Sequence, residues 1–380
     1  MGALDELKLL TSQMKLEPAE DVGCPRISNP KQDAIDVFNA QLPNGKTISL
    51  LKTLLTSACE HNCNYCPFRS GRDFRRGTLK PDEMAQVFNA VHRAGIVEGI
   101  FLSSGIAGGG IRTQDRIIAT AEILRKKYNF QGYIHLKLMP GSERAQVERT
   151  MHLADRVSLN LEAPNTLRLQ KLAPEKIFEE ELLQPLRWVD EIRRTTSPHL
   201  GWRGRWPSMT TQFVVGAVGE SDLELLTTTS YMHENLHLGR AYFSSFEPTP
   251  DTPFEDYPPA STIREHRLYQ ASFLLRDYGY DLEELPFEPN GNLPENTDPK
   301  MAWARSNLLN FPVEINNAER QDLLKVPGIG PKSAEKILQA RRQGVFHQLE
   351  DLHKIGVNSI RAAPFILLDG KQPHHQLSLW

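Results

Sequence analysis

The amino-acid sequence predicts an α/β protein that consists of a partial, TIM-type (β/α)6 barrel and a small all-α domain at the carboxyl end. Short apolar strands alternate six times with longer helical patterns from Ile48 onward, at the spacing typical of βα units. Eight such units close a full barrel, so six units predict a barrel that stays open. A stretch rich in proline and asparagine at 283–313 then precedes a compact helical pattern.

The expected elements follow from the period of the apolar residues. Strands are expected at 48–56, 99–103, 131–138, 156–161, 210–216 and 240–246. Helices are expected at 81–94, 112–128, 142–153, 176–194, 221–235 and 262–278. Parallel strands bring the loops that follow them to one end of the barrel, which is where such barrels carry their chemistry.

These patterns divide the chain of 380 residues into five segments. They are an amino-terminal extension at 1–45, the barrel at 46–282, a linker at 283–313, the helical domain at 314–368 and a tail at 369–380. The formal net charge of -3 provides no overall basic field, so any contact with nucleic acid has to be local.

The composition favours a reducing, cytoplasmic location and no membrane partner. No apolar stretch approaches the roughly 20 residues that span a bilayer. The acidic, amphipathic amino terminus does not have the pattern of a secretory signal. Three of the four cysteines lie in one loop, which leaves no framework of disulfide bonds.

That loop directly follows the first expected strand and carries Cys59, Cys63 and Cys66 in a C-x3-C-x2-C motif. Three thiolates at this spacing can hold three corners of a [4Fe–4S] cluster, which normally takes four protein ligands. One iron is then open, as is typical of a reactive metal site. Zinc is the alternative, and His61 lies in the loop, but no second C-x2-C pair follows in the sequence.

With Tyr65 directly before the last cysteine, the motif resembles the signature of the radical S-adenosylmethionine (radical SAM) enzymes. The resemblance implies a [4Fe–4S] cluster and S-adenosylmethionine as cofactors, with Tyr65 among the cofactor contacts. It also implies an electron donor such as flavodoxin or ferredoxin. The reduced cluster of this family cleaves S-adenosylmethionine to methionine and a 5′-deoxyadenosyl radical, which takes a hydrogen atom from the substrate.

Polar residues at the ends of later strands are further candidates for cofactor contacts. Ser103, Ser104 and Gly105 end the second strand and lead into a glycine run at 106–110, whose N–H groups a ligand could reach. A loop at this place binds the cofactor's amino group in the radical SAM family. Many members have Gly-Gly-Glu there, whereas this chain has Ser-Ser-Gly. The candidates on the third to fifth strands are His135, Lys137, Asn160, Glu162 and Gln212. The alternative for these side chains is polar filling of the barrel.

Two segments are candidates for contact with DNA. The first is Trp202, Arg203, Arg205 and Trp206, because arginine suits phosphate and tryptophan stacks on unpaired bases. We expect this segment to stand near the reactive face of the barrel; a solvated loop is the alternative. The second segment, 319–338, resembles the helix-hairpin-helix motif of DNA-binding proteins, in which backbone N–H groups and a helix start meet a phosphate. Its predicted contacts are Pro327, Gly328, Ile329, Gly330 and Lys332. A motif used only for docking protein is the alternative.

The order of the two domains resembles a group of radical SAM proteins assigned to DNA modification or repair. The likeness covers nearly the whole chain after Lys52, and Cys24 resembles a cysteine of that group without an assigned role. The predicted function is therefore radical modification or repair of a base or sugar in DNA. The alternatives are a radical SAM enzyme acting on RNA, protein or a small metabolite, and a non-catalytic iron–sulfur protein that binds DNA.

Helix-hairpin-helix DNA glycosylases also carry a [4Fe–4S] cluster, and Asp351 falls near the position of their catalytic aspartate. Their cluster cysteines follow the hairpin, whereas no cysteine follows it in this chain. Asp351 is instead expected at the start of a helix, where an acidic side chain is favourable.

Overall fold

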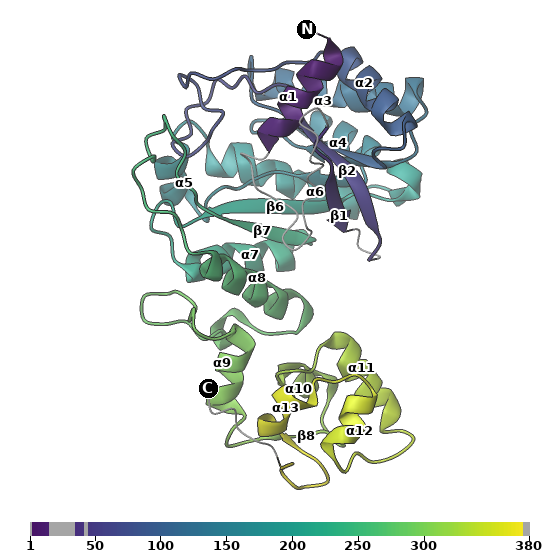
Figure 1. Cartoon of the computed structure of the whole chain (residues 1–380), viewed down its shortest axis with the longest axis vertical. Coiled ribbons are helices and arrows are strands. Elements are labelled where there is room, and N and C mark those ends of the chain that lie inside the picture. Colours follow the sequence, from purple (N-terminus) through teal and green to yellow (C-terminus); the bar gives the residue numbers. More distant parts are fainter. Residues whose placement is uncertain (1, 15–34, 42–44, 375–380) are drawn as a thin grey trace. The chain divides into compact units, whose positions relative to one another are not determined.

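The computed structural model describes residues 2–14, 35–41 and 45–374, so Cys24 lies outside the described residues. The chain forms two compact units (Figure 1). The first contains residues up to Glu220 together with Tyr231–Ser261, and the second contains Ser221–Ser230 and the chain from Thr262 onward. The boundary therefore passes through one helix, α7 (Asp222–Leu236).

The first unit is built on one seven-stranded sheet with the order β1-β2-β3-β4-β5-β6-β7. Its six parallel strands are those expected from the sequence: β2 (Thr47–Leu54), β3 (Gly99–Ser103), β4 (Tyr133–Lys137), β5 (Arg156–Ser158), β6 (Ser208–Val215) and β7 (Arg240–Ser245). The short β1 (Phe38–Gln41), which was not predicted, adds an antiparallel edge. The sheet is curled into a half-barrel, which confirms the predicted fold class.

Helices between the strands pack side by side along the sheet (Figure 1). They are α2 (Pro81–Arg93), α3 (Gly110–Glu122) with a π-helical end at Ile123–Lys127, α4 (Arg144–Leu153), and α6 (Gln184–Thr195), which a π-helical turn at Phe178–Leu183 precedes. Two further helices are α1 (Ala3–Gln13), in the amphipathic amino-terminal extension, and α5 (Thr166–Leu172), which was not predicted.

Helix α2 illustrates why these segments are helical. Pro81 occupies the first turn, followed by Asp82 and Glu83, and His92 and Arg93 lie in the last turn, so the charges at both ends favour the helix dipole. Its buried residues recur with helical spacing and form one apolar face: Met84, Ala85, Val87, Phe88 and Val91.

The second unit is mainly helical. Its elements are α8 (Thr262–Asp277), α9 (Pro299–Asn307), β8 (Val313–Glu314), α10 (Arg320–Lys325), α11 (Pro331–Ala340), α12 (Leu349–Lys354), α13 (Ser359–Ala362) and β9 (Ile366–Leu367). Strands β8 and β9 form a short parallel pair. The segment predicted as a linker, 283–313, contains α9, so its proline and asparagine content was a misleading signal.

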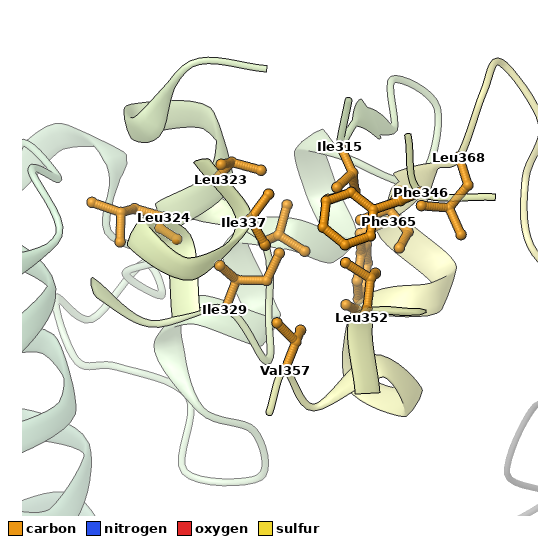
Figure 2. Packing of buried hydrophobic residues seen from close by; sticks show 14 of the residues in the cluster. Ile315, Leu323, Leu324, Ile329, Ile337, Phe346, Leu352, Val357, Phe365 and Leu368 are labelled. Atoms are coloured by element: carbon orange, nitrogen blue, oxygen red, sulfur yellow. The ribbon is translucent and has the colours of Figure 1, made fainter. Parts of the chain in front are cut away.

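The small helices share one apolar core (Figure 2). Ile337 of α11 is fully buried in it beside Leu324 and Ile329. Ala304 and Leu308 of the α9 region belong to the same core. The helix-hairpin-helix region is therefore stabilised by residues that precede the motif in the sequence.

Among the described residues, no helix has both the length and the apolar character that crossing a lipid bilayer requires.

We predict that Ile337→Ala weakens this core, because it removes fully buried methyl groups and leaves a cavity. The free energy of opening, measured by hydrogen exchange of the α11 amides, should fall by about 2–5 kcal/mol. Ile360→Ala is the matched control, because Ile360 is 81% exposed on α13, and it should change the value by less than about 0.5 kcal/mol. Equal effects of the two variants would contradict the packing described here.

Candidate active site

The cysteine loop leaves the carboxyl end of β2 and is closed at its base by hydrogen bonds. The amide of Ser57 donates to the carbonyl of Gly77 at 3.0 Å, and the Gly77 amide donates to Ser57 Oγ at 2.9 Å. Thr56 and Thr78 form an adjacent bridge. The loop between these contacts carries all three cysteines but contains no helix or strand, so its shape depends on individual contacts.

Arg76 provides four of those contacts. Its guanidinium donates to the carbonyl oxygens of Ser57 at 2.8 Å, Phe68 at 3.0 Å, Arg69 at 2.7 Å and Arg72 at 3.2 Å. The planar group also lies over the Phe74 ring at 4.3 Å. Arg76 therefore joins the two ends of the cysteine loop, and only a guanidinium offers enough donors to do so.

The glycine run after β3 contacts the cysteine loop rather than only the cavity. The amides of Gly108 and Gly109 each donate to a carboxylate oxygen of Glu60 at 2.9 Å. Gly105 lies so close to this loop that a Cβ atom would come within 2.3 Å of the Ala58 carbonyl. The expectation that the whole glycine run offers its N–H groups to a ligand is therefore wrong for Gly108 and Gly109, because Glu60 uses them.

A second neighbour of the cysteine loop consists of the end of α5 and the segment that follows it. The amide of Asn64 donates to the carbonyl of Leu172 at 2.8 Å, and the amide of Asn62 donates to Glu175 at 3.2 Å. The Asn64 side chain adds a hydrogen bond to the Lys171 carbonyl at 2.8 Å. These contacts hold the loop against the fourth βα connection.

A cavity of about 490 Å³ lies where the strands end. With the exception of His135, the residues predicted to bind the cluster or the cofactor line it: Cys59, Cys63, Tyr65, Cys66, Ser103, Ser104, Gly105, Lys137, Asn160, Glu162 and Gln212. These residues come from the ends of β2, β3, β4, β5 and β6, because parallel strands bring their carboxyl ends together. His135 lies deeper in β4, where its Nε2 meets Ser158 Oγ at 2.8 Å.

Several lining residues were not predicted as cofactor contacts, among them Lys176, Arg72 and the segment 246–250 after β7. Arg72 donates to the carbonyls of Pro250 at 2.8 Å and Pro67 at 2.9 Å, so it joins the last strand's loop to the cysteine loop. The segment 246–250 directly follows a predicted strand, and this position could have predicted that it lines the cavity. Lys176 had no comparable signal, because it lies far from any strand end in the sequence.

Glu162 and Lys176 form a buried ion pair in the cavity wall. The distance between Lys176 Nζ and Glu162 Oε1 is 2.9 Å, and the two side chains are 10% and 6% exposed. Lys176 lowers the pKa of Glu162 against the opposing effect of burial, and burial together with the Glu162 charge raises the pKa of Tyr65. The other carboxylate oxygen of Glu162 is buried without a hydrogen-bond partner among the described residues.

Glu162 is also held in an unusual backbone conformation. Its φ is 65°, in the left-handed region that non-glycine residues seldom adopt. Its amide donates to Gln212, and its carbonyl accepts from Val214, so β6 fixes this conformation. Strain of this kind is common at ligand sites.

The three cysteines suit the predicted cluster. Cys59, Cys63 and Cys66 are free thiols on one loop that line the same cavity. Burial raises the pKa of Cys63 while Lys176 lowers it, and the amide of Phe68 donates to Cys66 Sγ at 3.4 Å. In the described part of the chain, no three histidine, cysteine or acidic side chains surround a single metal ion. A cubane cluster does not require that arrangement, because each cysteine binds a different iron.

The tryptophan and arginine segment does not lie near this cavity. It directly precedes β6, so it lies at the amino ends of the parallel strands, opposite the cysteine loop. The Trp202 ring covers the Arg125 guanidinium at 3.7 Å, and Trp206 donates from Nε1 to the Thr196 carbonyl at 3.1 Å. The expectation that this segment stands near the reactive face was wrong.

The two arginines of this segment also contact the barrel. Arg205 pairs with Asp155 at 3.5 Å, and Arg203 donates to the carbonyl of Gln131. Asp155 in turn pairs with the buried Arg125 at 3.0 Å. These contacts explain why the segment contains tryptophan and arginine, and they do not require a bound nucleic acid.

The hairpin residues of the second unit divide into buried and accessible ones. Pro327 and Ile329 are buried, and the Ile329 amide donates to the Val326 carbonyl at 3.1 Å, which corrects the expectation that both contact DNA. Gly328 has a φ of 86°, as its tight turn requires. Gly328 and Gly330 are partly exposed, and Lys332 is exposed.

Asp351 caps helix α12, as expected. Its carboxylate accepts the amides of His347 and Gln348 at 3.3 Å. These backbone hydrogen bonds lower the pKa of Asp351. This capping role accounts for Asp351 without a glycosylase reaction.

We predict that Arg76→Lys lowers cluster content, because an ammonium cannot reach four carbonyls of the loop at once. Losses of such supporting contacts commonly cost about 10–100-fold in metal affinity. Iron and sulfide per chain after anaerobic reconstitution measure the effect, and circular dichroism checks the fold. Arg75→Lys is the control, because Arg75 is an exposed neighbour outside this set of contacts. Full cluster content in Arg76→Lys would refute this role.

Comparisons with known proteins agree with this site. Residues 53–205 match the Radical SAM superfamily, and residues 311–359 match the Helix-hairpin-helix motif. No curated protein matches significantly.

Three solved structures illustrate the similarity at low identity. Methylornithine synthase (PylB) gives a TM-score of 0.48 at 14% identity over 60% of this chain and 61% of its own. The FeFe-hydrogenase maturase HydG from Carboxydothermus hydrogenoformans gives a TM-score of 0.47 at 16% identity, over 60% of this chain and 51% of its own. A radical SAM methyltransferase from Sphaerobacter thermophilus gives a TM-score of 0.46 at 17% identity, over 66% of this chain and 74% of its own. The matches thus span less than two thirds of the first two proteins.

The two family matches fall on the two units that carry the cysteine loop and the hairpin. The chain contains a radical SAM domain at residues 53–205, followed by a helix-hairpin-helix motif at 311–359, and it is an enzyme with a [4Fe–4S] cluster and S-adenosylmethionine as cofactors.

Proposed function

We propose that the protein cleaves S-adenosylmethionine reductively and uses the resulting radical chemistry to modify or repair a base or sugar in DNA. The cluster and S-adenosylmethionine supply the radical chemistry, and the protein binds, orients and shields the reactants. The observation that carries the DNA assignment is an accessible glycine hairpin beside an uncapped helix start in the second unit.

In the cavity of the first unit, Cys59, Cys63 and Cys66 would hold the cluster. Asn160, Glu162 and Gln212 would bind the polar groups of S-adenosylmethionine. The buried Glu162 oxygen without a partner supports this assignment, because a buried acceptor is costly unless a ligand donates to it. Tyr65, Lys137 and the Ser103–Gly105 turn complete the proposed cofactor contacts.

In the second unit, the proposed phosphate site is the start of α11. The first N–H groups of a helix have no acceptor within the helix, and Gly330 has no side chain to cap them. The amides of Gly328 and Gly330 form no hydrogen bond among the described residues. The exposed Lys332 adds a positive charge there. Such groups suit a phosphate of the backbone and read no base sequence.

The position of the cavity restricts the form of the substrate. A base stacked inside a duplex cannot reach a pocket at the strand ends of a barrel. We therefore infer that the target nucleotide is flipped out, damaged or single-stranded. The hairpin would hold the flanking backbone while the nucleotide is exposed.

The cluster has to receive an electron from outside the chain. We propose a small redox protein such as flavodoxin or ferredoxin as the donor, and a reducing cytoplasm as the location that preserves the cluster.

The ligand set predicts the behaviour of cysteine variants. Reconstituted protein with dithionite should convert S-adenosylmethionine into 5′-deoxyadenosine and methionine, and Cys63→Ala should abolish this activity. Chromatography of the products measures it. Cys24→Ala is the matched control and should retain the activity, because the expected ligand set does not include Cys24. Cleavage by Cys63→Ala at the wild-type rate would show that the assigned ligands are wrong.

The phosphate site predicts salt-dependent binding of DNA. Affinity for a labelled duplex should fall steeply with salt, and Lys332→Met should weaken binding and reduce the slope of log K against log salt by about 1. Arg342→Gln, beyond the other end of α11, is the control for charge. An unchanged slope in Lys332→Met, or tighter binding of RNA than of DNA in competition, would contradict the DNA assignment.

A further inference from the structure

The proposed phosphate-binding hairpin is held by a lysine that lies outside the helix-hairpin-helix motif. Lys300 of α9 donates from Nζ to the carbonyl oxygen of Ile329 at 2.6 Å. Ile329 is the central residue of the hairpin, and its side chain is buried in the core. The hairpin backbone is therefore fixed from inside by both the core and the Lys300 ammonium.

The Lys300 ammonium also contacts an aromatic ring, that of Tyr278. Lys300 Nζ lies 4.6 Å from the centre of the Tyr278 ring, which follows α8. This distance is within the range of cation–π attraction. A Cβ atom on Gly330 would approach Tyr278 Oη to 3.3 Å, so the ring lies directly beside the hairpin. Lys300, Tyr278 and the hairpin are in mutual contact.

The charges around Lys300 are few. Asp298 begins α9, where it accepts the Met301 amide at 2.9 Å, and it also pairs with Arg361 of α13 at 2.6 Å. Lys300 itself forms no ion pair within the described residues. Asp298, Arg361 and the Tyr278 phenol are thus the titratable or charged groups that face it, while the hairpin contributes only backbone.

We propose that Lys300 is a positioning residue of the phosphate site, a role that rests on the proposed binding of DNA by the hairpin. Its ammonium fixes the hairpin backbone through Ile329 and adds positive charge to the site, so that the affinity for DNA follows the protonation of Lys300.

The electrostatic surroundings of Lys300 agree with this role. Burial lowers the pKa of Lys300 to about 7, with Asp298 acting against this shift and Arg361 acting with it. Below this value the side chain is charged and attracts phosphate. As the pH rises through neutrality the charge is lost, while DNA phosphodiesters stay ionised. Binding of DNA should therefore weaken with rising pH.

The same unit also contains histidines, such as His347 and His353, so the wild-type protein alone does not test the proposal. Lys300→Arg isolates the contribution of Lys300, because arginine stays charged throughout. Lys300→Met removes the charge at every pH. Lys325→Met is the control for loss of a lysine charge: Lys325 also lies over aromatic rings, those of Tyr280 and Trp303, but it pairs with Glu284 and does not contact Ile329.

The experiment measures fluorescence anisotropy of a labelled duplex with the full chain, at constant ionic strength, from about pH 6 to about pH 8. We expect the Kd of the wild type to rise roughly three- to tenfold more than that of Lys300→Arg, as suits one charge beside a phosphate. Lys300→Met should bind weakly throughout, and Lys325→Met should follow the wild type.

The outcomes separate this proposal from the proposed function. If Lys300→Arg shows the same pH dependence as the wild type, or Lys300→Met binds as tightly as the wild type at low pH, the role of Lys300 is refuted while DNA binding stands. If no variant binds DNA at any pH, the proposed function fails and the role of Lys300 fails with it. Circular dichroism of Lys300→Met checks its fold, and Lys300→Arg provides the test if that variant is unfolded.

Discussion

The candidate active site depends on how a loop without regular structure is held in one shape. Three thiolates can share a cluster only if their backbone is fixed, and the loop from Ser57 to Gly77 has no helix or strand to fix it. Instead, four of its carbonyl groups accept hydrogen bonds from one guanidinium, that of Arg76. Neighbouring loops add the contacts of Glu60 and Asn64. The barrel supplies the position of the loop, and these hydrogen bonds supply its shape.

The same contacts explain why the cavity combines residues that are distant in the sequence. Arg72 ties the loop after β7 to the cysteine loop, and Lys176 reaches Glu162 from beyond α5. Both cations compensate for burial of polar or acidic groups, which would otherwise be costly. The charged side chains of Lys176, Glu162 and Arg72 therefore lie near the thiolates, and each has an ion-pair or hydrogen-bond partner.

The sequence predicted the six parallel strands and the polar residues at their ends that line the cavity, because both follow from local patterns. Apolar runs mark the strands, and the residue type at each strand end marks the cavity. It did not predict Lys176 or Arg76, whose roles depend on contacts between distant segments. The place expected for Trp202 and Trp206 was wrong, because it rested on composition and not on their position directly before a parallel strand, which puts them at the amino ends of the sheet. The proline and asparagine content of 283–313 predicts a linker, whereas the structure has the short helix α9 in that segment.

The central claim is that three cysteines leave one iron of the cluster open to S-adenosylmethionine. Electron paramagnetic resonance of the reduced protein, recorded with and without S-adenosylmethionine, tests it most directly. We expect the signal of the reduced cluster to change when S-adenosylmethionine is added, because a ligand on the open iron alters its electronic structure. An identical spectrum in both samples, with the cluster fully reduced, would contradict the account.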